Sequence, residues 1–428
     1  MHDVARSKVE ALRQLPITPE EKGFGGPSHL NATTATELIE SEAHAADGWL
    51  GSPRALVRAS ALEHNIETMA RYCRDRGTEL QPHGKTTMAP QVVAAQLTAG
   101  ATGVTVATVP QLRVFHSMGL GPVLIANQVV DEAGATWLGR ALADAEHLEA
   151  TCYVDSVEGV HRLDEVVGNA RGTATTRRLG VLVELGHANG RTGARTLGQA
   201  EQVAEAAAAA SSLKLLGVAG YEGSIVRATP AQTVAAARDF SCGLGDLTRR
   251  LLDRGLLVGR PIVSAGGSAY FDAVVDALAS EPAWRLVLRS GCYVTHDHGL
   301  YHDISPFERT CEGYTLRPAL RVLAPVLSCP EHGIVVIGAG RRDVSSDGAL
   351  PVVLSAQRGD HALDVSGIIS RRLFDQHMVA AAPEGCELQP GDEVELGISH
   401  PCTTFDKWRW IPVVDDDDRI VDVLRTFF

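Results

Sequence analysis

Between about residues 54 and 290, short apolar runs alternate with longer helix-forming stretches. Each run is continuously apolar, which is typical of parallel strands that are covered on both faces. After a short first strand at 55–57, we expect strands around Leu80 and at 103–107, 122–126, 150–154, 179–185, 215–219, 261–264 and 285–288. The helix-forming stretches between the strands include 109–118, 137–145, 197–210 and 231–254. Eight such units predict an α/β fold, a (β/α)8 TIM-type barrel, with a doubly wound open sheet as the structural alternative.

The barrel is expected to occupy residues 54–310. Ser60 is the predicted cap of a helix over 61–75, because a serine before a helical run commonly accepts a hydrogen bond from its first turn. Residues 1–53 are polar and helix-prone. They are expected to form an N-terminal helical arm that packs on the body of the protein or on a partner subunit.

After about residue 310 the pattern changes, because short strands punctuated by glycine and proline replace the helices. These strands are expected at 319–326, 333–337, 351–354 and 393–396, and in the last stretch from Trp410. Residues 311–428 are therefore predicted to form a separate, mostly β domain. The acidic run Asp415–Asp418 is expected to be a solvated turn.

Composition narrows the class of protein. The 428 residues are 45% apolar and 21% charged, which are globular values. The net charge of -13 argues against a nucleic-acid surface, and no apolar run approaches the roughly 20 residues that a membrane span needs. The N-terminus lacks the apolar segment of a signal peptide, and the eight cysteines are scattered without a Cys-x-x-Cys pair. These features predict a reducing, cytoplasmic location.

Lys85 is the first candidate for chemistry, in the stretch Gln81–Pro90 between a strand and a helix. The chain has only five lysines among its 39 basic residues. Unlike arginine, a desolvated lysine can lose its proton and attack a carbonyl group. An isolated loop lysine is more often a solvated cation, so the interpretation depends on its neighbours; His83 is expected to be a packing residue.

The neighbours are expected at the carboxyl ends of the other barrel strands, where such barrels carry their active sites. Gly266, Gly267 and Ser268 follow the seventh strand and have the composition of a phosphate cradle. Arg191, between Gly190 and Gly193, follows the fifth strand and can hydrogen-bond a ring nitrogen or a phenolate. Tyrosines follow the sixth and eighth strands, at Tyr221 and Tyr293. A reactive lysine, a phosphate cradle and a partner for an aromatic ring together suggest pyridoxal phosphate.

These motifs, in this order, resemble those of the alanine-racemase-fold (fold type III) pyridoxal phosphate enzymes. They are Pro82–Thr86, Asn189–Gly193, Gly220–Gly223 and Gly266–Ser268. The closer similarity is to the branch that contains D-serine dehydratase and D-threonine aldolase. The resemblance implies a homodimer, a D-amino-acid substrate, Lys85 as the catalytic residue bonded to the cofactor, and Arg191 at its ring. It also implies cofactor-binding roles for Gly266, Gly267 and Ser268 at the phosphate and for Tyr221 and Tyr293 beside the ring.

A second motif, His400-Pro401-Cys402, lies near the C-terminus. Imidazole and thiolate at positions i and i+2 suit zinc, although the spacing alone arises more often by chance. In the family that the chain resembles, His-x-Cys binds a divalent metal in the dehydratases, whereas the aldolases tend to carry His-x-Asp. We therefore expect a metal at His400 and Cys402, with zinc as the first candidate and manganese or magnesium as alternatives. The segment His296–Asp303 also has the composition of a metal site, but we expect it to have a structural or substrate-shaping role.

Three hypotheses follow. The first is a lyase that eliminates the β-hydroxyl of a D-3-hydroxy amino acid to give a 2-oxo acid and ammonia. The two open metal positions would take water and the substrate hydroxyl, because hydroxide is a poor leaving group without a Lewis acid. The second is retro-aldol cleavage to glycine and an aldehyde, and the third is a non-catalytic pyridoxal phosphate carrier. D-Serine, D-threonine, 3-hydroxyaspartate and larger 3-hydroxy amino acids are all candidate substrates.

Overall fold

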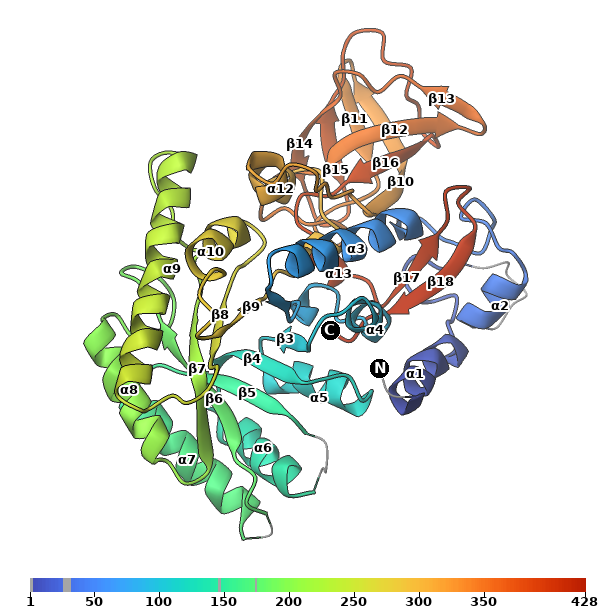
Figure 1. The fold of residues 1–428 in the computed structure, drawn as a ribbon. Coiled ribbons are helices and arrows are strands. Elements are labelled where there is room, and N and C mark those ends of the chain that lie inside the picture. The colour runs from blue at the N-terminus through green and yellow to red at the C-terminus, as the bar shows by residue number, and fades with distance from the viewer. Residues whose placement is uncertain (1–2, 26–31, 145–147, 174) are drawn as a thin grey trace. The chain divides into compact units, whose positions relative to one another are not determined.

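The structure is a computed structural model, and it describes residues 3–25, 32–144, 148–173 and 175–428 (Figure 1). The described chain divides into two compact units. No helix in these four ranges combines the length and the apolar character that crossing a membrane requires.

The first unit comprises residues 70–85 and 96–291. In the described part of the chain it contains one sheet of eight parallel strands, in the order β2-β9-β8-β7-β6-β5-β4-β3. The strands are β2 (Glu79–Leu80), β3 (Val104–Val106), β4 (Val123–Gln128), β5 (Ala150–Val154), β6 (Leu179–Leu185), β7 (Leu213–Gly220), β8 (Ile262–Ala265) and β9 (Arg285–Leu288). All eight coincide with the predicted strands.

The two outer strands of this order are joined by backbone contacts that follow β2. The Thr102 amide donates to the Leu80 carbonyl (2.8 Å). The Thr105 amide donates to the Pro82 carbonyl (2.9 Å), and His83 forms a parallel bridge with Thr105. The sheet therefore closes on itself, and the predicted TIM-type barrel is confirmed.

Helices cover the outside of the barrel strands (Figure 1). They are α5 (Val109–Ser117), α6 (Glu132–Asp144), α7 (Val157–Arg171), α8 (Leu197–Ala209), α9 (Pro230–Asp253) and α10 (Phe271–Leu278). A hydroxyl accepts a hydrogen bond from the amide three residues later at the start of four helices, namely at Thr108, Ser156, Thr196 and Thr229. Such caps satisfy amides that have no partner within the helix and so fix where these helices begin.

The second unit comprises residues up to 69, 86–95 and 292–428. Its strands are β1 (Arg54–Arg58), β10 (Leu320–Glu331), β11 (Ile334–Ile337), β12 (Val352–Arg358), β13 (His361–Leu363), β14 (Ile369–Leu373), β15 (Met378–Ala381), β16 (Glu393–Gly397), β17 (Trp410–Val414) and β18 (Ile420–Arg425). Most pairs are antiparallel, along the path β13-β12-β16-β10-β1-β17-β18, with β11, β15 and β14 continuing from β10. The predicted C-terminal β domain is therefore present.

The boundaries of the units differ from the expected ones at two places. Strand β1 pairs antiparallel with β10 and parallel with β17, so it is a central strand of the β sheet and not the lead into the barrel. Residues 292–310 also belong to the second unit. They contain η3 (Cys292–Val294), α11 (Leu300–Ile304) and α12 (Pro306–Arg309). The remaining elements are η2 (Gly84–Thr86), α3 (Ala59–Asp75), α4 (Pro90–Thr98) and α13 (Cys402–Phe405).

The N-terminal arm packs on the β sheet of its own chain. It contains α1 (Asp3–Glu10), η1 (Ala11–Gln14) and α2 (Ala35–Glu40). Ile17, Phe24 and Leu38 of the arm share a buried apolar cluster with Trp410 and Val423 of the sheet. Burial of these side chains accounts for the attachment of a segment that is otherwise polar.

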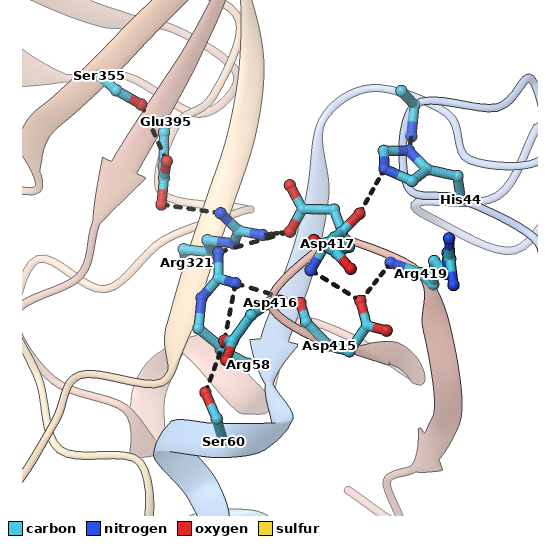
Figure 2. A network of polar contacts seen from close by, with 12 residues as sticks. His44, Arg58, Ser60, Arg321, Ser355, Glu395, Asp415, Asp416, Asp417 and Arg419 are labelled. Atoms are coloured by element: carbon cyan, nitrogen blue, oxygen red, sulfur yellow. Dashed lines mark hydrogen bonds and ion pairs between the residues drawn. The ribbon is translucent and has the colours of Figure 1, made fainter.

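The acidic turn between β17 and β18 is a node of ion pairs (Figure 2). Asp416 and Asp418 face the Arg58 guanidinium at 3.4 and 3.5 Å, and Arg321 also pairs with Asp418. The predicted cap at Ser60 is wrong, because α3 begins at Ala59 and the Ser60 hydroxyl donates to Asp416 (2.7 Å). The run is exposed in part, as expected, but it also ties β1, α3 and β10 to the turn.

The pairing of β7 with β8 depends on Gly217, which lies opposite Ile262. Its φ is +156°, and a Cβ added there would lie 1.9 Å from the Ile262 carbonyl oxygen. Because this neighbour is backbone within a strand, it cannot move aside. We predict that Gly217→Ala lowers the free energy of unfolding by at least about 2 kcal/mol, measured by urea or thermal unfolding.

Gly198, in α8, is the matched control, because open space surrounds the position of its Cβ. Gly198→Ala should raise stability by about 0.5–1 kcal/mol, since alanine loses less conformational freedom in a helix. Equal stability of the two variants would contradict the requirement for glycine at position 217.

Candidate functional site

Lys85 lies in the short helix η2, five residues after β2 ends, at the carboxyl end of the barrel strands. Its approach is fixed by the backbone bonds that join the chain after β2 to β3. Gly84 packs closely here, since a Cβ at this position would lie 2.8 Å from Phe115 and Val104. Lys85 is half-buried, and it makes no hydrogen bond or ion pair with the described residues of its own unit.

A cluster of cations surrounds His83 in the first unit. The pKa of His83 lies well below its usual 6.5, because burial and the charges of Lys85, Arg289 and Arg191 all disfavour the imidazolium. His83 Nδ1 is buried and has no hydrogen-bond partner among the described residues. His83 is therefore a neutral ring among cations, and the structure brings Lys85 and Arg191 to the same end of the barrel.

The predicted phosphate cradle has the geometry of an anion site, and the anion that it holds is a side chain of the protein. The Gly266 and Gly267 amides donate to the Glu222 carboxylate at 3.2 and 2.6 Å. Gly266 has a φ of +89°, which favours glycine, and the Ser268 hydroxyl accepts from the Gly291 amide (3.3 Å). Glu222 lies within the motif Gly220–Gly223, but no role was predicted for it; its position directly after Tyr221 at a strand end was the available signal.

The loop that carries Arg191 is organised by Arg195, which was also missed. The Arg195 guanidinium donates to the carbonyls of Thr192 and Gly193 (2.8 Å each) and to those of Gly190 and Arg191. The Arg191 guanidinium lies 4.4 Å from the centre of the Tyr221 ring. This cation–π distance brings together two residues that were predicted separately.

Buried polar side chains occupy the barrel interior below these loops. The Arg289 guanidinium donates to the Ser264 hydroxyl (2.8 Å) and to the Gly220 carbonyl (2.7 Å). Arg289 also lies 5.7 Å from the Tyr153 ring, and burial raises the pKa of Tyr153 to about 12. Sequence patterns did not predict this set, because polar residues within continuous apolar strands give no sign of which face they occupy.

A cluster of metal-ligating groups lies in the second unit. One ligand atom each of Cys292, His400 and Cys402 lies within 4.8 Å of the others, and this is the only such group of three among the described residues. His400 and Cys402 were predicted as a pair, and Cys292 was not assigned to them. A hydrogen bond also joins Cys402 Sγ and Thr86 Oγ1 (3.4 Å), and Thr86 directly follows Lys85 in the chain.

The charges of this cluster are set by its neighbours. His400 Nδ1 lies 2.7 Å from Asp347 Oδ2, which leaves Nε2 for a metal, and Asp347 also accepts from the Thr403 hydroxyl (2.6 Å). Burial opposes a charge on His400, but Cys402 and Asp347 raise its pKa to about 9. Hydrogen bonds with Cys292 and His400 lower the pKa of Cys402 well below its usual 9.0, against the effect of burial. Cys402 and Asp347 therefore favour the protonated form of His400, and Cys292 and His400 favour the thiolate form of Cys402.

The segment His296–Asp303 has a structural role. Asp297 is buried and accepts from the amides of Gly299, Tyr301 and His302, at the start of α11. Burial lowers the pKa of His296 to about 4, and the nearby His302 and His298 act in the same direction. The structural interpretation was thus the better one. Tyr293, predicted beside the cofactor, is buried in η3 of the second unit next to Cys292.

The donor set of the first unit fits pyridoxal phosphate. Two adjacent amides of the turn after β8 converge on the Glu222 carboxylate, so the turn has the donor geometry of an anion site. A lysine and an arginine lie at the same end of the barrel. For the second unit, an imidazole oriented by a carboxylate and two sulfur atoms fit a zinc ion.

Residues 57–276 match the family described as "Alanine racemase, N-terminal domain", and residues 319–414 match a "Putative serine dehydratase domain". The chain therefore belongs to the alanine racemase N-terminal domain family. It is a member of the fold type III pyridoxal phosphate enzymes, as the motifs predicted.

Relatives that are named as aldolases extend over most of the chain. A 3-hydroxy-D-aspartate aldolase of Paracoccus denitrificans (strain Pd 1222) is 27% identical over 362 residues, covering 84% of this chain and 87% of that protein. A D-threonine aldolase of an Arthrobacter species is 23% identical over 370 residues, with coverages of 85% and 89%. Such relatives confirm the prediction of a pyridoxal phosphate-dependent lyase.

Among solved structures, the D-threonine aldolase of Filomicrobium marinum superimposes with a TM-score of 0.72 at 23% identity, over 88% of this chain and 95% of that one. The similarity confirms the fold.

The Arg195 contacts lead to a prediction about the cofactor loop. Arg195→Ala should weaken pyridoxal phosphate binding about three- to tenfold, because the loop that presents Arg191 loses a net stabilisation of about one hydrogen bond. Arg195→Lys should behave in the same way, since a point-like ammonium cannot contact the four carbonyls together. A cofactor titration followed by absorbance gives the affinity.

Arg227 is the control, because it is also exposed, follows a neighbouring strand, and its guanidinium donates to Val226 of its own loop. Arg227→Ala should leave the affinity unchanged. If Arg195→Ala also binds the cofactor as the wild type does, Arg195 does not position the loop.

Proposed function

We propose that the protein is a pyridoxal phosphate- and metal-dependent dehydratase that eliminates the β-hydroxyl of a D-3-hydroxy amino acid, giving a 2-oxo acid and ammonia. The observation that carries the proposal is the arrangement of Cys402, His400 and Asp347. A thiolate and an oriented imidazole are ligands for a Lewis-acidic metal such as zinc. Elimination needs such an acid, because hydroxide leaves Cβ poorly without one.

The residues that would hold the cofactor are Lys85, Arg191, Tyr221 and the turn Gly266–Ser268, with Tyr293 as a further candidate. Bound there, pyridoxal phosphate supplies an electron sink for charge at Cα, and the metal supplies a Lewis acid for the β-hydroxyl. The Lys85 amine takes the Cα proton. The Arg191 guanidinium would donate a hydrogen bond to the cofactor ring.

Thr86 follows the proposed catalytic lysine in sequence, and its hydroxyl is hydrogen-bonded to the proposed metal ligand Cys402.

A relative that is named as a dehydratase also supports the proposal. A D-threo-3-hydroxyaspartate dehydratase of Delftia sp. (strain HT23) is 35% identical over 77 residues, only 18% of this chain. One solved structure of that dehydratase is a cysteine-to-alanine mutant in a metal-free form.

Retro-aldol cleavage is the second candidate, because the relatives that extend over most of the chain are named as aldolases. It would use the same cofactor residues, but the base would take the proton of the substrate hydroxyl and the Cα–Cβ bond would break.

We also propose a homodimer, which the family resemblance suggests, and a cytoplasmic location, which the cysteine content suggests.

Lys85→Ala should abolish the visible absorbance of the bound cofactor and lower the elimination rate more than about 10³-fold, because both the covalent link and the base are lost. Absorbance spectra and assays for 2-oxo acid measure the two effects. Lys214→Ala is the control, since Lys214 is an exposed lysine at the opposite end of a barrel strand. Retention of the band in the Lys85 variant would refute the assignment of the cofactor lysine.

Product analysis with D-threonine separates the two reactions. We expect 2-oxobutyrate and ammonia, and a chelator should lower their formation at least about 100-fold while the cofactor band persists. Glycine and acetaldehyde would instead establish the aldolase. Full elimination after the metal has been removed would contradict the Lewis-acid role, and no turnover of any D-amino acid with cofactor bound would favour a carrier.

A further inference from the structure

Cys292 lies against the proposed metal ligands in a way that the His-x-Cys motif does not predict. Its Sγ atom is 3.4 Å from Cys402 Sγ, although the two residues are 110 positions apart in the chain. Cys292 opens η3 and is 5% exposed, whereas Cys402 opens α13. Two structural elements therefore present a sulfur atom to one point, and His400 presents an imidazole nitrogen to the same point.

We infer that Cys292 is a third protein ligand of the metal, so that two thiolates and one imidazole hold the ion and one position stays open. The inference rests on the proposed function, because it concerns the metal that the dehydratase would use. Each thiol gives up its proton when it binds, so a dication with these ligands carries no net charge.

The distance between the two sulfur atoms fits a metal ion bound by both of them better than it fits a disulfide bond. Two sulfur ligands at about 2.3 Å from a tetrahedral zinc lie about 3.8 Å apart, and a disulfide requires about 2.05 Å. The observed 3.4 Å thus needs a change of about 0.4 Å to hold a metal and about 1.4 Å to form a disulfide. The positions of the cysteines are closer to those of metal ligands.

The ligand class determines the metal. Two thiolates and an imidazole suit zinc or another soft to borderline ion, whereas manganese and magnesium prefer oxygen ligands. Three protein ligands and one open position are also the usual arrangement of catalytic zinc. The open position would accept one substrate oxygen, which is sufficient to polarise a β-hydroxyl, and the site would not need a second open position for water.

X-ray absorption of the zinc-loaded holoenzyme tests this without any variant, because it counts the sulfur ligands. Two sulfur atoms at about 2.3 Å are expected. In the cobalt-substituted enzyme, Cys292→Ser should lower the thiolate-to-metal charge-transfer band about twofold, as two thiolates become one. The zinc affinity of the Cys292→Ser variant should also fall. Loss of an outer-shell partner costs about 10- to 100-fold in affinity, and loss of a direct ligand should cost at least as much.

Cys311→Ser is the matched control, because Cys311 is equally buried in the same unit, at 5% exposed, and does not belong to the cluster. It should keep the sulfur count, the band and the affinity. One sulfur atom in the wild type, or a Cys292→Ser variant with unchanged affinity, would overturn the inference and leave the metal-dependent dehydratase standing. A disulfide between Cys292 and Cys402 in the purified active enzyme, or a wild type that binds no metal, would overturn both the inference and the proposed metal-dependent function.

Discussion

The hydrogen bonds that join the chain after β2 to β3 are the constraint on which the site depends. They close the barrel, and they also fix the segment that leads to Lys85. In a parallel sheet the carboxyl ends of all strands lie at one edge, so closure brings Lys85 to the edge that carries Arg191, Tyr221 and Gly266. The backbone thus determines the place of Lys85, the proposed reactive residue, before any side-chain contact is considered.

Two buried ions then hold three neighbouring strand ends in register. The Glu222 carboxylate, after β7, accepts from the glycine amides after β8. The Arg289 guanidinium, after β9, donates to Ser264 in β8 and to the end of β7 at Gly220. A buried charge is costly without such partners, and here hydrogen bonds to strand ends satisfy both groups. The turn proposed to hold the phosphate is therefore supported from within the barrel.

The sequence predicted the barrel because the physical signal was local. Continuous apolar runs with helices between them allow few arrangements, and all eight strands were found where expected. Strand β1 was assigned to the wrong unit because an apolar run does not indicate its partners, and its partners are β10 and β17. Ser60 has the residue type of a helix cap, but a tertiary contact with Asp416 uses its hydroxyl.

The same distinction applies to the site. Lys85, Arg191 and the glycine turn were recognisable because each belongs to a short motif at a strand end. Cys292 follows the eighth barrel strand in the sequence. Its proximity to Cys402, however, arises only when the second unit folds. Arg195 was missed because its role is to bind carbonyls of its own loop, and any exposed arginine has the same appearance in a sequence.

The place of β1 in the centre of its sheet has a consequence for the order in which the chain folds during synthesis. All barrel strands lie between residues 79 and 288, so their pairing can be complete while the ribosome is still making the last third of the chain. Residues 54–58, although made earlier, wait for partners near 320 and 410. The β sheet of the second unit is therefore expected to be the last and slowest part of the chain to fold. Contacts between residues so distant in sequence form only after a large loss of chain entropy.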